Sequence, residues 1–408
     1  MQDTVELVVG AEPWELTLPA AKRIELERAP VVPPACTAAE LVRAALEKPF
    51  HFEALRRALT PDDRVCVVVD PRLPHFVPML CEVLAHIGSA GVNLSAVTVL
   101  SPPGASDAWM DELPDDFTDV TAETHDPANE KKLAYLATTK GGRRAYLNRS
   151  LVEADFMVAL TGRRYDPARH IGGAEVALFP ELSNEETRAA NAGPFTREIQ
   201  WSGREESEEV AWLLGTPFFV QVIEGSGDSV QEVVAGLVES SAEGKRRQDA
   251  RWKLTAPERG DVVLAALSGA RERITFLDIA RAAANAARVA KPGGRVAVLT
   301  DAAPDLGDAM HWLRDLDEPK APAARLAKEK PADWAECRYW CAAAQKAGVF
   351  FASGYPDEVV EELFATPIHS RSEVQRLLDG AESAIVIPDA HKARAALALS
   401  VYGSQEKE

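Results

Sequence analysis

Short runs of apolar and β-branched residues recur along the chain and alternate with longer segments whose apolar positions follow helical spacing. The runs cover residues 65–70, 96–100, 156–160, 218–223, 261–267, 295–301 and 384–388. Helical spacing is clearest over residues 77–90, 276–290 and 356–365. Continuous apolar runs of this length are typical of buried parallel strands, and their alternation with helices predicts an α/β protein with helices on both faces of its sheets.

The pattern also predicts two domains. Residues 5–18 alternate apolar and polar positions around Gly10-Ala11-Glu12-Pro13, which indicates an antiparallel hairpin leading into the first domain. Residues 239–260 are charged and precede a new strand, so we place the boundary there. We expect domains at 1–245 and 246–408, each a mainly parallel sheet flanked by helices, with an active-site-like cleft between them. Residues 316–333 are predicted to form a surface excursion.

The predicted helix 276–290 has an apolar stripe and a polar face. The polar face is expected to look toward water or a cleft and carries Arg281, Asn285 and Arg288. Lys291-Pro292-Gly293-Gly294 is a stop signal before the next strand. No G-x-G-x-x-G follows any strand, so the sequence gives no direct support for a dinucleotide site.

Composition narrows the choice of partners and compartment. The net charge of −18 disfavours nucleic acid and anionic lipid. No window approaches the ~18 apolar residues of a membrane span, and the start lacks the features of a signal peptide, so the expected compartment is the cytoplasm. The five cysteines fit reduced thiols, and Cys337 and Cys341 lack the further ligands of a zinc site.

Three stretches of the chain, taken together, resemble the nickel-dependent lactate racemase family. The first runs through 44–49 and 59–69 to Asp70-Pro71-Arg72-Leu73-Pro74, similar to the family's first strand and D-x-T-R-P turn. The second contains Thr124-His125-Asp126-Pro127 and Leu147-Asn148-Arg149. The third, 162–180, contains His170-Ile171-Gly172-Gly173, similar to the glycine pair of the family's cofactor loop.

The resemblance implies a two-domain protein that holds a nickel-pincer nucleotide tethered to a lysine and ligated by a histidine. In the family this group takes a hydride from the substrate's α-carbon and returns it to either face, while two histidines exchange the hydroxyl proton. These roles demand an amine, a nitrogen donor to the metal and groups that titrate near neutrality.

The corresponding positions here carry other residues. The resemblance places the first catalytic histidine on or near Ala105, the second on or near Tyr165 and the tether on or near Glu175. The metal-binding histidine aligns with Asn191, and no lysine occurs between Lys140 and Lys245. We therefore expect no nickel-pincer cofactor and no metal ligands.

The residues that are present could still bind a carboxylate. Arginine offers a planar fork suited to carboxylate, and the proposed substrate-binding residues are Arg72, Arg169, Arg281, Gly172 and Gly173. The alternative for the loop 163–175 is a solvated segment whose arginines pair with nearby carboxylates.

Two residues of that loop, His170 and Tyr165, are the candidates for acid-base catalysis. The alternative for His170 is a structural hydrogen bond beside the glycine turn. A phenol titrates near ~10, so Tyr165 would need strong perturbation to act as a base.

Two functional hypotheses follow. The first is a racemase-like enzyme that acts on a 2-hydroxy acid or related sugar acid by chemistry other than the nickel hydride shuttle. The second is a non-catalytic pseudo-enzyme that serves as a ligand sensor or partner subunit. Under both, the expected partner is a small-molecule carboxylate, and assembly into a homo-oligomer is left open.

Overall fold

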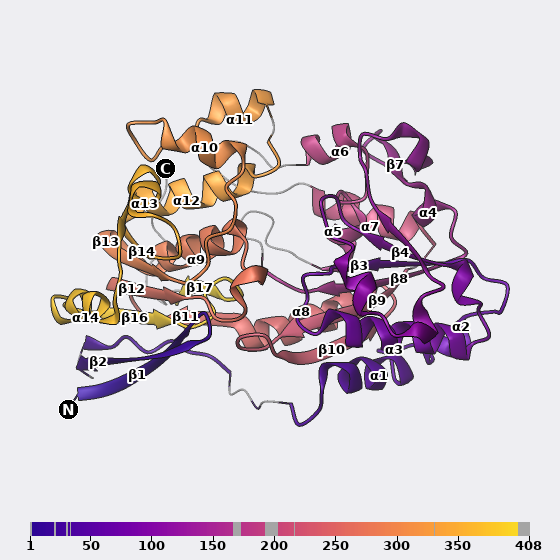
Figure 1. Cartoon of the computed structure of the whole chain (residues 1–408), viewed down its shortest axis with the longest axis horizontal. Helices are drawn as coiled ribbons and strands as arrows, with labels where there is room; N and C mark the ends of the chain where they lie inside the picture. Colours follow the sequence, from indigo (N-terminus) through magenta and orange to yellow (C-terminus); the bar gives the residue numbers. More distant parts are fainter. Residues whose placement is uncertain are drawn as a thin grey trace. The chain divides into compact units, whose positions relative to one another are not determined.

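A computed structural model of the chain describes residues 2–19, 22–29, 32, 34–165, 173–191, 203–215, 217–329 and 331–398. The chain forms two compact units (Figure 1). The central unit is Val31–Asp249, and the terminal unit combines Met1–Pro30 with Ala250–Glu408. This division differs from the expected 1–245 and 246–408 chiefly at the N-terminus, because the first thirty residues pack with the C-terminal part of the chain.

The central unit contains a six-stranded sheet in the order β10-β9-β8-β3-β4-β5. All neighbouring strands are parallel except β10, which runs antiparallel to β9. The strands are β3 (Val65–Val69), β4 (Val97–Ser101), β5 (Thr121–Thr124), β8 (Phe156–Gly162), β9 (Phe218–Glu224) and β10 (Val230–Gly236). The four runs predicted as strands in this part of the chain are therefore strands.

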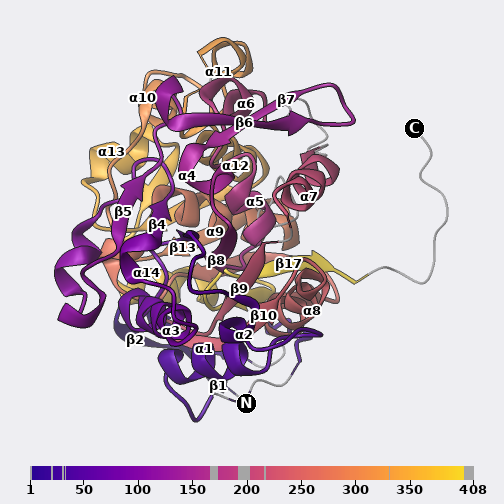
Figure 2. The same cartoon turned by 90° about the vertical axis from the view of Figure 1, so that its right-hand side faces the viewer.

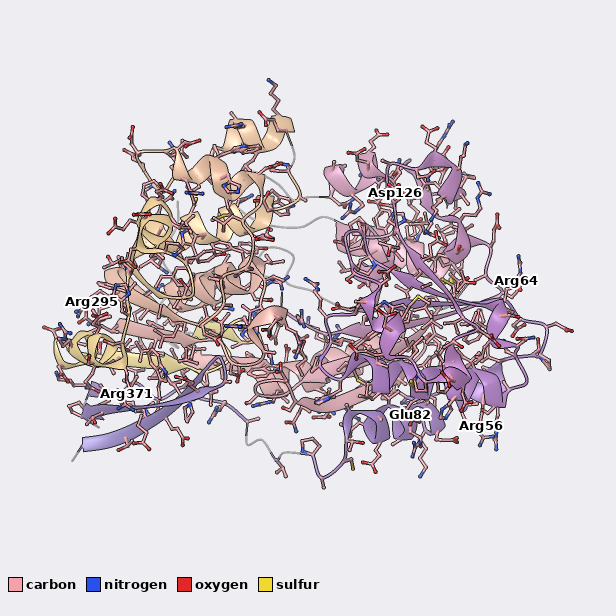
Figure 3. The ribbon with its side chains drawn as sticks, viewed as in Figure 1. Arg56, Arg64, Glu82, Asp126, Arg295 and Arg371 are labelled. Atoms are coloured by element: carbon pink, nitrogen blue, oxygen red, sulfur yellow. The ribbon has the colours of Figure 1, made fainter. Side chains whose placement is uncertain are left out.

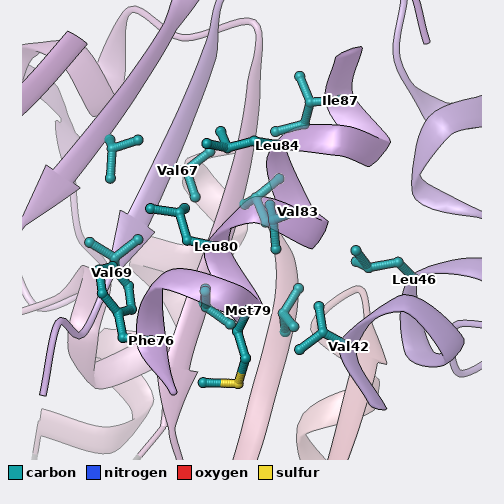
Figure 4. Close-up of a cluster of buried hydrophobic side chains, with 14 of the residues drawn as sticks. Val42, Leu46, Val67, Val69, Phe76, Met79, Leu80, Val83, Leu84 and Ile87 are labelled. Carbon is teal, nitrogen blue, oxygen red and sulfur yellow. The ribbon is translucent and has the colours of Figure 1, made fainter. Parts of the chain in front are cut away.

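Helices cover both faces of this sheet (Figure 2). On one face, α1 (Ala38–Glu47) and α3 (Phe76–Ser89) pack their apolar stripes onto alternate strand residues, as Figure 4 shows for Val67, Val69, Leu80 and Val83. The opposite face packs against α4 (Arg149–Val152), α5 (Ala174–Leu178) and α7 (Gly203–Leu213).

Further elements complete the central unit. A hairpin of β6 (Leu133–Thr138) and β7 (Arg144–Asn148) adds to it, together with α2 (Leu55–Ala58), α6 (Glu185–Ala190) and most of α8 (Ser240–Trp252). The charged segment 239–260, predicted to hold the domain boundary, thus contains the long helix α8 and the strand β11 (Lys253–Ala256).

The terminal unit has a five-stranded, fully parallel sheet in the order β15-β14-β13-β12-β16. Its strands are β12 (Gly260–Ala266), β13 (Ala290–Leu299), β14 (Gly348–Ala352), β15 (Ala365–Pro367) and β16 (Ala384–Ile387). The predicted stop at residues 291–294 lies inside β13, where the register with β12 shifts. A further strand, β17 (Arg394–Leu397), pairs with β11.

Two groups of elements pack on the terminal sheet. The hairpin of β1 (Gln2–Val9) and β2 (Glu12–Pro19) shares an apolar core with β12, β13 and α14 (Arg371–Asp379). The helices α9 (Phe276–Val289) and α12 (Trp334–Lys346) pack on each other and on β13. The remaining helices are α10 (Asp308–Arg314), α11 (Ala323–Glu329), within the predicted surface excursion, and α13 (Asp357–Glu362).

Two expectations need correction. The hairpin was expected to lead into the first domain, but its apolar residues face the terminal sheet instead. The polar face of α9 was expected to meet water or a cleft, but Asn285 is only 3% exposed and donates to the carbonyl oxygens of Ala390 and Ala393 at 3.1 and 2.7 Å. Within the described ranges, no helix is long and apolar enough to cross a membrane.

Candidate functional site

The carboxyl ends of the parallel strands in the central unit bring several predicted residues to one edge of the sheet. Strands β3 and β8 are neighbours, and each is followed at this edge by a polar segment that contains Arg72 or Tyr165. A Cβ on Gly162 would lie 3.0 Å from Leu73, so the end of β8 directly contacts the turn after β3. Ligands of α/β proteins commonly bind at such an edge.

A buried hydrogen-bond network ties the segment after β8 to its neighbours. The Arg163 guanidinium donates to the Gln221 side chain on β9 and, at 3.5 Å, to the Ser241 hydroxyl on α8. The Gln221 amide donates to Ser240 at 2.9 Å, and Ser241 donates to the Glu175 carboxylate on α5. These five residues, which we call the Arg163 network, fix β8, β9, α5 and α8 relative to one another.

Gly173 lies directly against this network. Its φ of 144° suits glycine alone, and a Cβ there would lie 2.9 Å from a terminal nitrogen of Arg163. The group that packs against Gly173 is therefore the Arg163 guanidinium. Gly172, the other glycine of the predicted pair, lies outside the described residues.

The next two side chains after Arg163 are also paired within the central unit. Arg164 and Glu224, both largely buried, form an ion pair at 2.6 Å. The buried Tyr165 donates its phenolic hydrogen to Asp249 on α8. The alternative raised for this loop, in which its arginines pair with nearby carboxylates, describes Arg164.

Arg72 differs from these residues because it remains largely in solvent. Its side chain is 53% exposed and contacts Asp70 at 3.4 Å. An ion pair this exposed contributes little to stability.

Arg281 belongs to the terminal unit, on α9. It is largely buried and lies 3.5 Å from Asp278, whose carboxylate also caps the start of that helix through Thr275. Of the predicted site residues, the structure thus brings Arg72, Tyr165 and Gly173 to one sheet edge and places Arg281 in the other unit. Arg169 and His170 lie outside the described residues.

The positions that the resemblance assigns to the cofactor carry no amine or imidazole in the described part of the chain. Glu175 is a carboxylate bonded to Ser241, and Asn191 donates its side-chain amide to the Thr187 carbonyl at 3.0 Å. The described residues contain no group of three or more His, Cys, Asp or Glu side chains that could hold a metal. This donor set does not fit a lysine-tethered nickel group.

His125, near the carboxyl edge after β5, is a buried structural residue. Its Nε2 donates to the Ser183 carbonyl at 2.9 Å, and its Nδ1 faces the Asn148 amide at 3.4 Å. Burial lowers the pKa of His125, which keeps the ring neutral in these contacts.

The sequence analysis missed Gln221, Ser241 and Asp249, which are the partners of the predicted loop residues. Gln221 lies within a predicted strand and carries no motif. Ser241 and Asp249 lie in the segment that was read as a domain boundary. In this segment Ser240, Gly244 and Gln248 recur every four residues and are buried, and this helical spacing was the signal that could have predicted α8.

Comparisons with known proteins agree with this architecture. Residues 9–191 match the family model of the lactate racemase N-terminal domain. The lactate racemase apoprotein from Thermoanaerobacterium thermosaccharolyticum is similar in structure, with a TM-score of 0.76 at 16% identity over 96% of this chain and 100% of that one. A Thermotoga maritima protein solved by the Northeast Structural Genomics Consortium gives a TM-score of 0.66 at 11% identity, over 90% of this chain and 100% of that one. No curated protein matches the sequence. Residues 9–191 thus match the lactate racemase N-terminal domain, and the chain shares the fold of the lactate racemase apoprotein.

Proposed function

We propose that this protein is a homologue of the lactate racemase family and that it binds a 2-hydroxy acid or a related sugar acid through its carboxylate, without the family's nickel-pincer group. One observation carries the proposal. Tyr165 and Glu175, at or near the positions of the acid-base histidine and the tether, are engaged by Asp249 and Ser241 of the same unit. At these positions the side chains bond to other polar groups of the protein, which supports the proposed loss of the cofactor.

The carboxylate of the ligand is assigned to the arginines. Arg72 supports this best among the described residues, because its guanidinium is half exposed at the carboxyl edge of the central sheet. Arg169 and Arg281 are the other two arginines that the sequence predicts for substrate binding. Arg163 and Arg164 have the different role of positioning the segment after β8.

The second candidate function is a non-catalytic ligand sensor or partner subunit, and the geometry of Tyr165 favours it. The phenol donates its hydrogen to Asp249. It therefore acts as a structural hydrogen-bond donor and not as a base toward a ligand. His170 remains the other proposed acid-base residue.

The test combines binding and turnover on the full-length protein. We expect a panel of both lactate enantiomers and several aldonic acids to contain a ligand that raises the melting temperature, with no racemisation or epimerisation detected by chiral chromatography. Arg72→Gln should reduce this stabilisation. Arg64→Gln is the matched control, because Arg64 is an exposed arginine of the same unit that pairs with Asp155 at the opposite edge (Figure 3).

Three results would contradict parts of the proposal. Turnover by the protein without nickel would make it an enzyme and reject the second candidate. Bound nickel, or a mass adduct on the segment after Gly162 when the protein is made with the family's cofactor-maturation enzymes, would reject the loss of the pincer group. No stabilisation by any member of the panel would reject the ligand class.

A further inference from the structure

Three basic residues lie together at the amino edge of the terminal sheet. Arg259 directly precedes β12, Arg288 lies in the last turn of α9 before β13, and Lys346 is the last residue of α12 before β14. The three strands are parallel neighbours, so their first residues share one edge. We call these residues the Arg259 cluster. Arg281 lies near the other end of α9, so the cluster is separate from the predicted substrate-binding residues.

Two members of the cluster converge on one carbonyl oxygen. A terminal nitrogen of Arg259 donates to the carbonyl oxygens of Arg288 and Ala290 at 2.6 and 3.1 Å. The Lys346 ammonium donates to the same Arg288 carbonyl oxygen at 3.4 Å. The guanidinium and the ammonium are therefore neighbours, and the oxygen that they share is neutral and cancels neither charge.

No carboxylate neutralises these two cations within the described ranges. Neither Arg259 nor Lys346 forms an ion pair there, and the exposed Glu258, next to Arg259 in sequence, pairs with neither. Other arginines of the terminal unit do pair with carboxylates, as in Arg271–Glu272, Arg295–Asp261 and Arg314–Glu362. In a chain with 63 acidic and 45 basic residues, two adjacent cations without a carboxylate are unexpected.

The surroundings make this excess of positive charge costly. Arg259, Arg288 and Lys346 are all partly buried. Burial lowers the pKa of Lys346, and the charges of Arg259 and Arg288 lower it further. Like charges held together in a partly buried place destabilise the fold, and an anion taken from solution would relieve that cost.

The cluster also has hydrogen-bond donors left for such an anion. Arg259 uses only one of its three side-chain nitrogens, and Lys346 uses only one of its three ammonium hydrogens. The other two nitrogens of Arg259 are not among the buried polar atoms, so solvent reaches them. A guanidinium fork beside an ammonium suits a doubly charged oxyanion with several acceptor oxygens, which is the chemistry of a phosphate group.

We propose that Arg259 and Lys346, assisted by the charge of Arg288, bind the phosphate group of a small molecule at the amino edge of the terminal sheet. The site lies within one unit and is independent of the proposed carboxylate ligand. Inorganic phosphate and a phosphate monoester share the chemistry that it recognises.

The experiment titrates the full-length protein with inorganic phosphate and with glycerol 2-phosphate by calorimetry at pH 7.5, against sodium chloride of equal ionic strength. Arg259→Gln and Lys346→Gln should each weaken binding about tenfold, the effect of one charge-assisted hydrogen bond. Lys346→Arg keeps the charge and should bind within about threefold of the wild type. Arg271→Gln is the matched control, because Arg271 is an exposed arginine of the same unit that pairs with Glu272.

Folding of each variant is checked by circular dichroism. If Arg259→Gln does not fold, Lys346→Gln still tests the site, because it removes only the 3.4 Å contact with the Arg288 carbonyl oxygen. Binding of either probe that the glutamine variants weaken supports the site, and the tighter probe identifies the source of the phosphate. The inference is wrong if neither probe binds beyond the chloride control, if the glutamine variants bind as the wild type does, or if Arg271→Gln weakens binding equally.

Discussion

The carboxyl edges of the two parallel sheets use buried polar side chains in different ways. At the edge of the terminal sheet, Asn285 donates to two carbonyl oxygens of the turn after β16, and Ser268 donates to Asp389 in that turn. At the edge of the central sheet, the Thr161 hydroxyl oxygen and the Gln248 amide nitrogen have no such partner in the described structure. Buried polar groups thus link elements at both edges, but only the central edge has the Thr161 hydroxyl and the Gln248 amide nitrogen without a hydrogen bond in the described structure.

Each edge contains a glycine with a positive φ angle, and replacing each one by alanine tests the comparison. Gly173→Ala should destabilise the protein by about 3 kcal/mol. Its φ of 144° is accessible only to glycine, and the new methyl group would displace the buried Arg163. The measurement is the free energy of unfolding in urea, with loss of the Arg163 network visible as a chemical-shift change at Ser241.

Gly10→Ala is the matched variant at the terminal edge. Gly10 has a φ of 58°, which alanine tolerates at about 1–2 kcal/mol, and the methyl group would meet the exposed Asp301 carboxylate, which can rotate away. Equal losses in the two variants would show that backbone strain alone, rather than the Arg163 contact, determines the cost at Gly173.

Much of the fold was predictable because it is recorded in local patterns. Buried parallel strands such as 65–69 and 156–160 appear as uninterrupted apolar runs, and α3 and α9 carry clear helical spacing. The hairpin at 5–18 was equally visible. The sheet on which the hairpin packs could not be predicted, because an apolar face such as that of Val5 and Leu7 suits either sheet. The choice depends on contacts with residues more than 250 positions away in sequence.

The site was predictable only in part, for a related reason. The resemblance drew attention to Tyr165 and Glu175, but their partners Asp249 and Ser241 lie 84 and 66 residues further along the chain. Those pairings depend on where α8 packs against β9. Composition and spacing carry no information about that packing.

Asn285 provides the second test of the comparison. Asn285→Leu should destabilise the protein by about 2–3 kcal/mol, because the carbonyl oxygens of Ala390 and Ala393 would lose buried donors. Thr161→Val is the counterpart at the central edge and should be neutral or slightly stabilising, since its hydroxyl has no partner to lose within the described chain. Urea unfolding of both variants measures the difference. A comparable loss in Thr161→Val would contradict the distinction between the edges.

A titratable group in the terminal unit gives a pH-dependent prediction. Burial is the main cause that raises the pKa of the Glu336 carboxyl to about 7; Asp333 and Asp278 act in the same direction, and a backbone hydrogen bond and Arg281 oppose them. The folded protein therefore keeps this proton to higher pH than the unfolded chain, and stability falls as pH rises from about 4.5 to about 7.

Glu336→Gln should remove that loss. We expect the variant to be more stable than the wild type by roughly 2 kcal/mol at pH 8, a value reduced for the partial exposure of the side chain, and about equally stable at pH 4. Urea unfolding at a series of pH values tests this. A difference that does not change with pH would mean that Glu336 acts through packing rather than ionisation.

His125 in the central unit should act in the opposite direction and with the smallest effect. Burial lowers its pKa, and its surroundings include Glu123 and Asp126, which oppose that shift, and Arg188, which reinforces it. The unfolded chain takes up the proton first as pH falls through the ordinary value of about 6.5, so the stability that the neutral ring provides is present above that value and is lost on acidification.

His125→Gln keeps an amide that can donate to the Ser183 carbonyl but cannot be protonated. Its stability between pH 7 and pH 5 should therefore fall less steeply than that of the wild type. In a Glu336→Gln background, where the opposing slope is absent, the difference should be easier to resolve. If the two proteins show the same slope, the protonation of His125 is not coupled to the folding of the central unit, and the ring's two hydrogen-bond contacts matter only for its orientation.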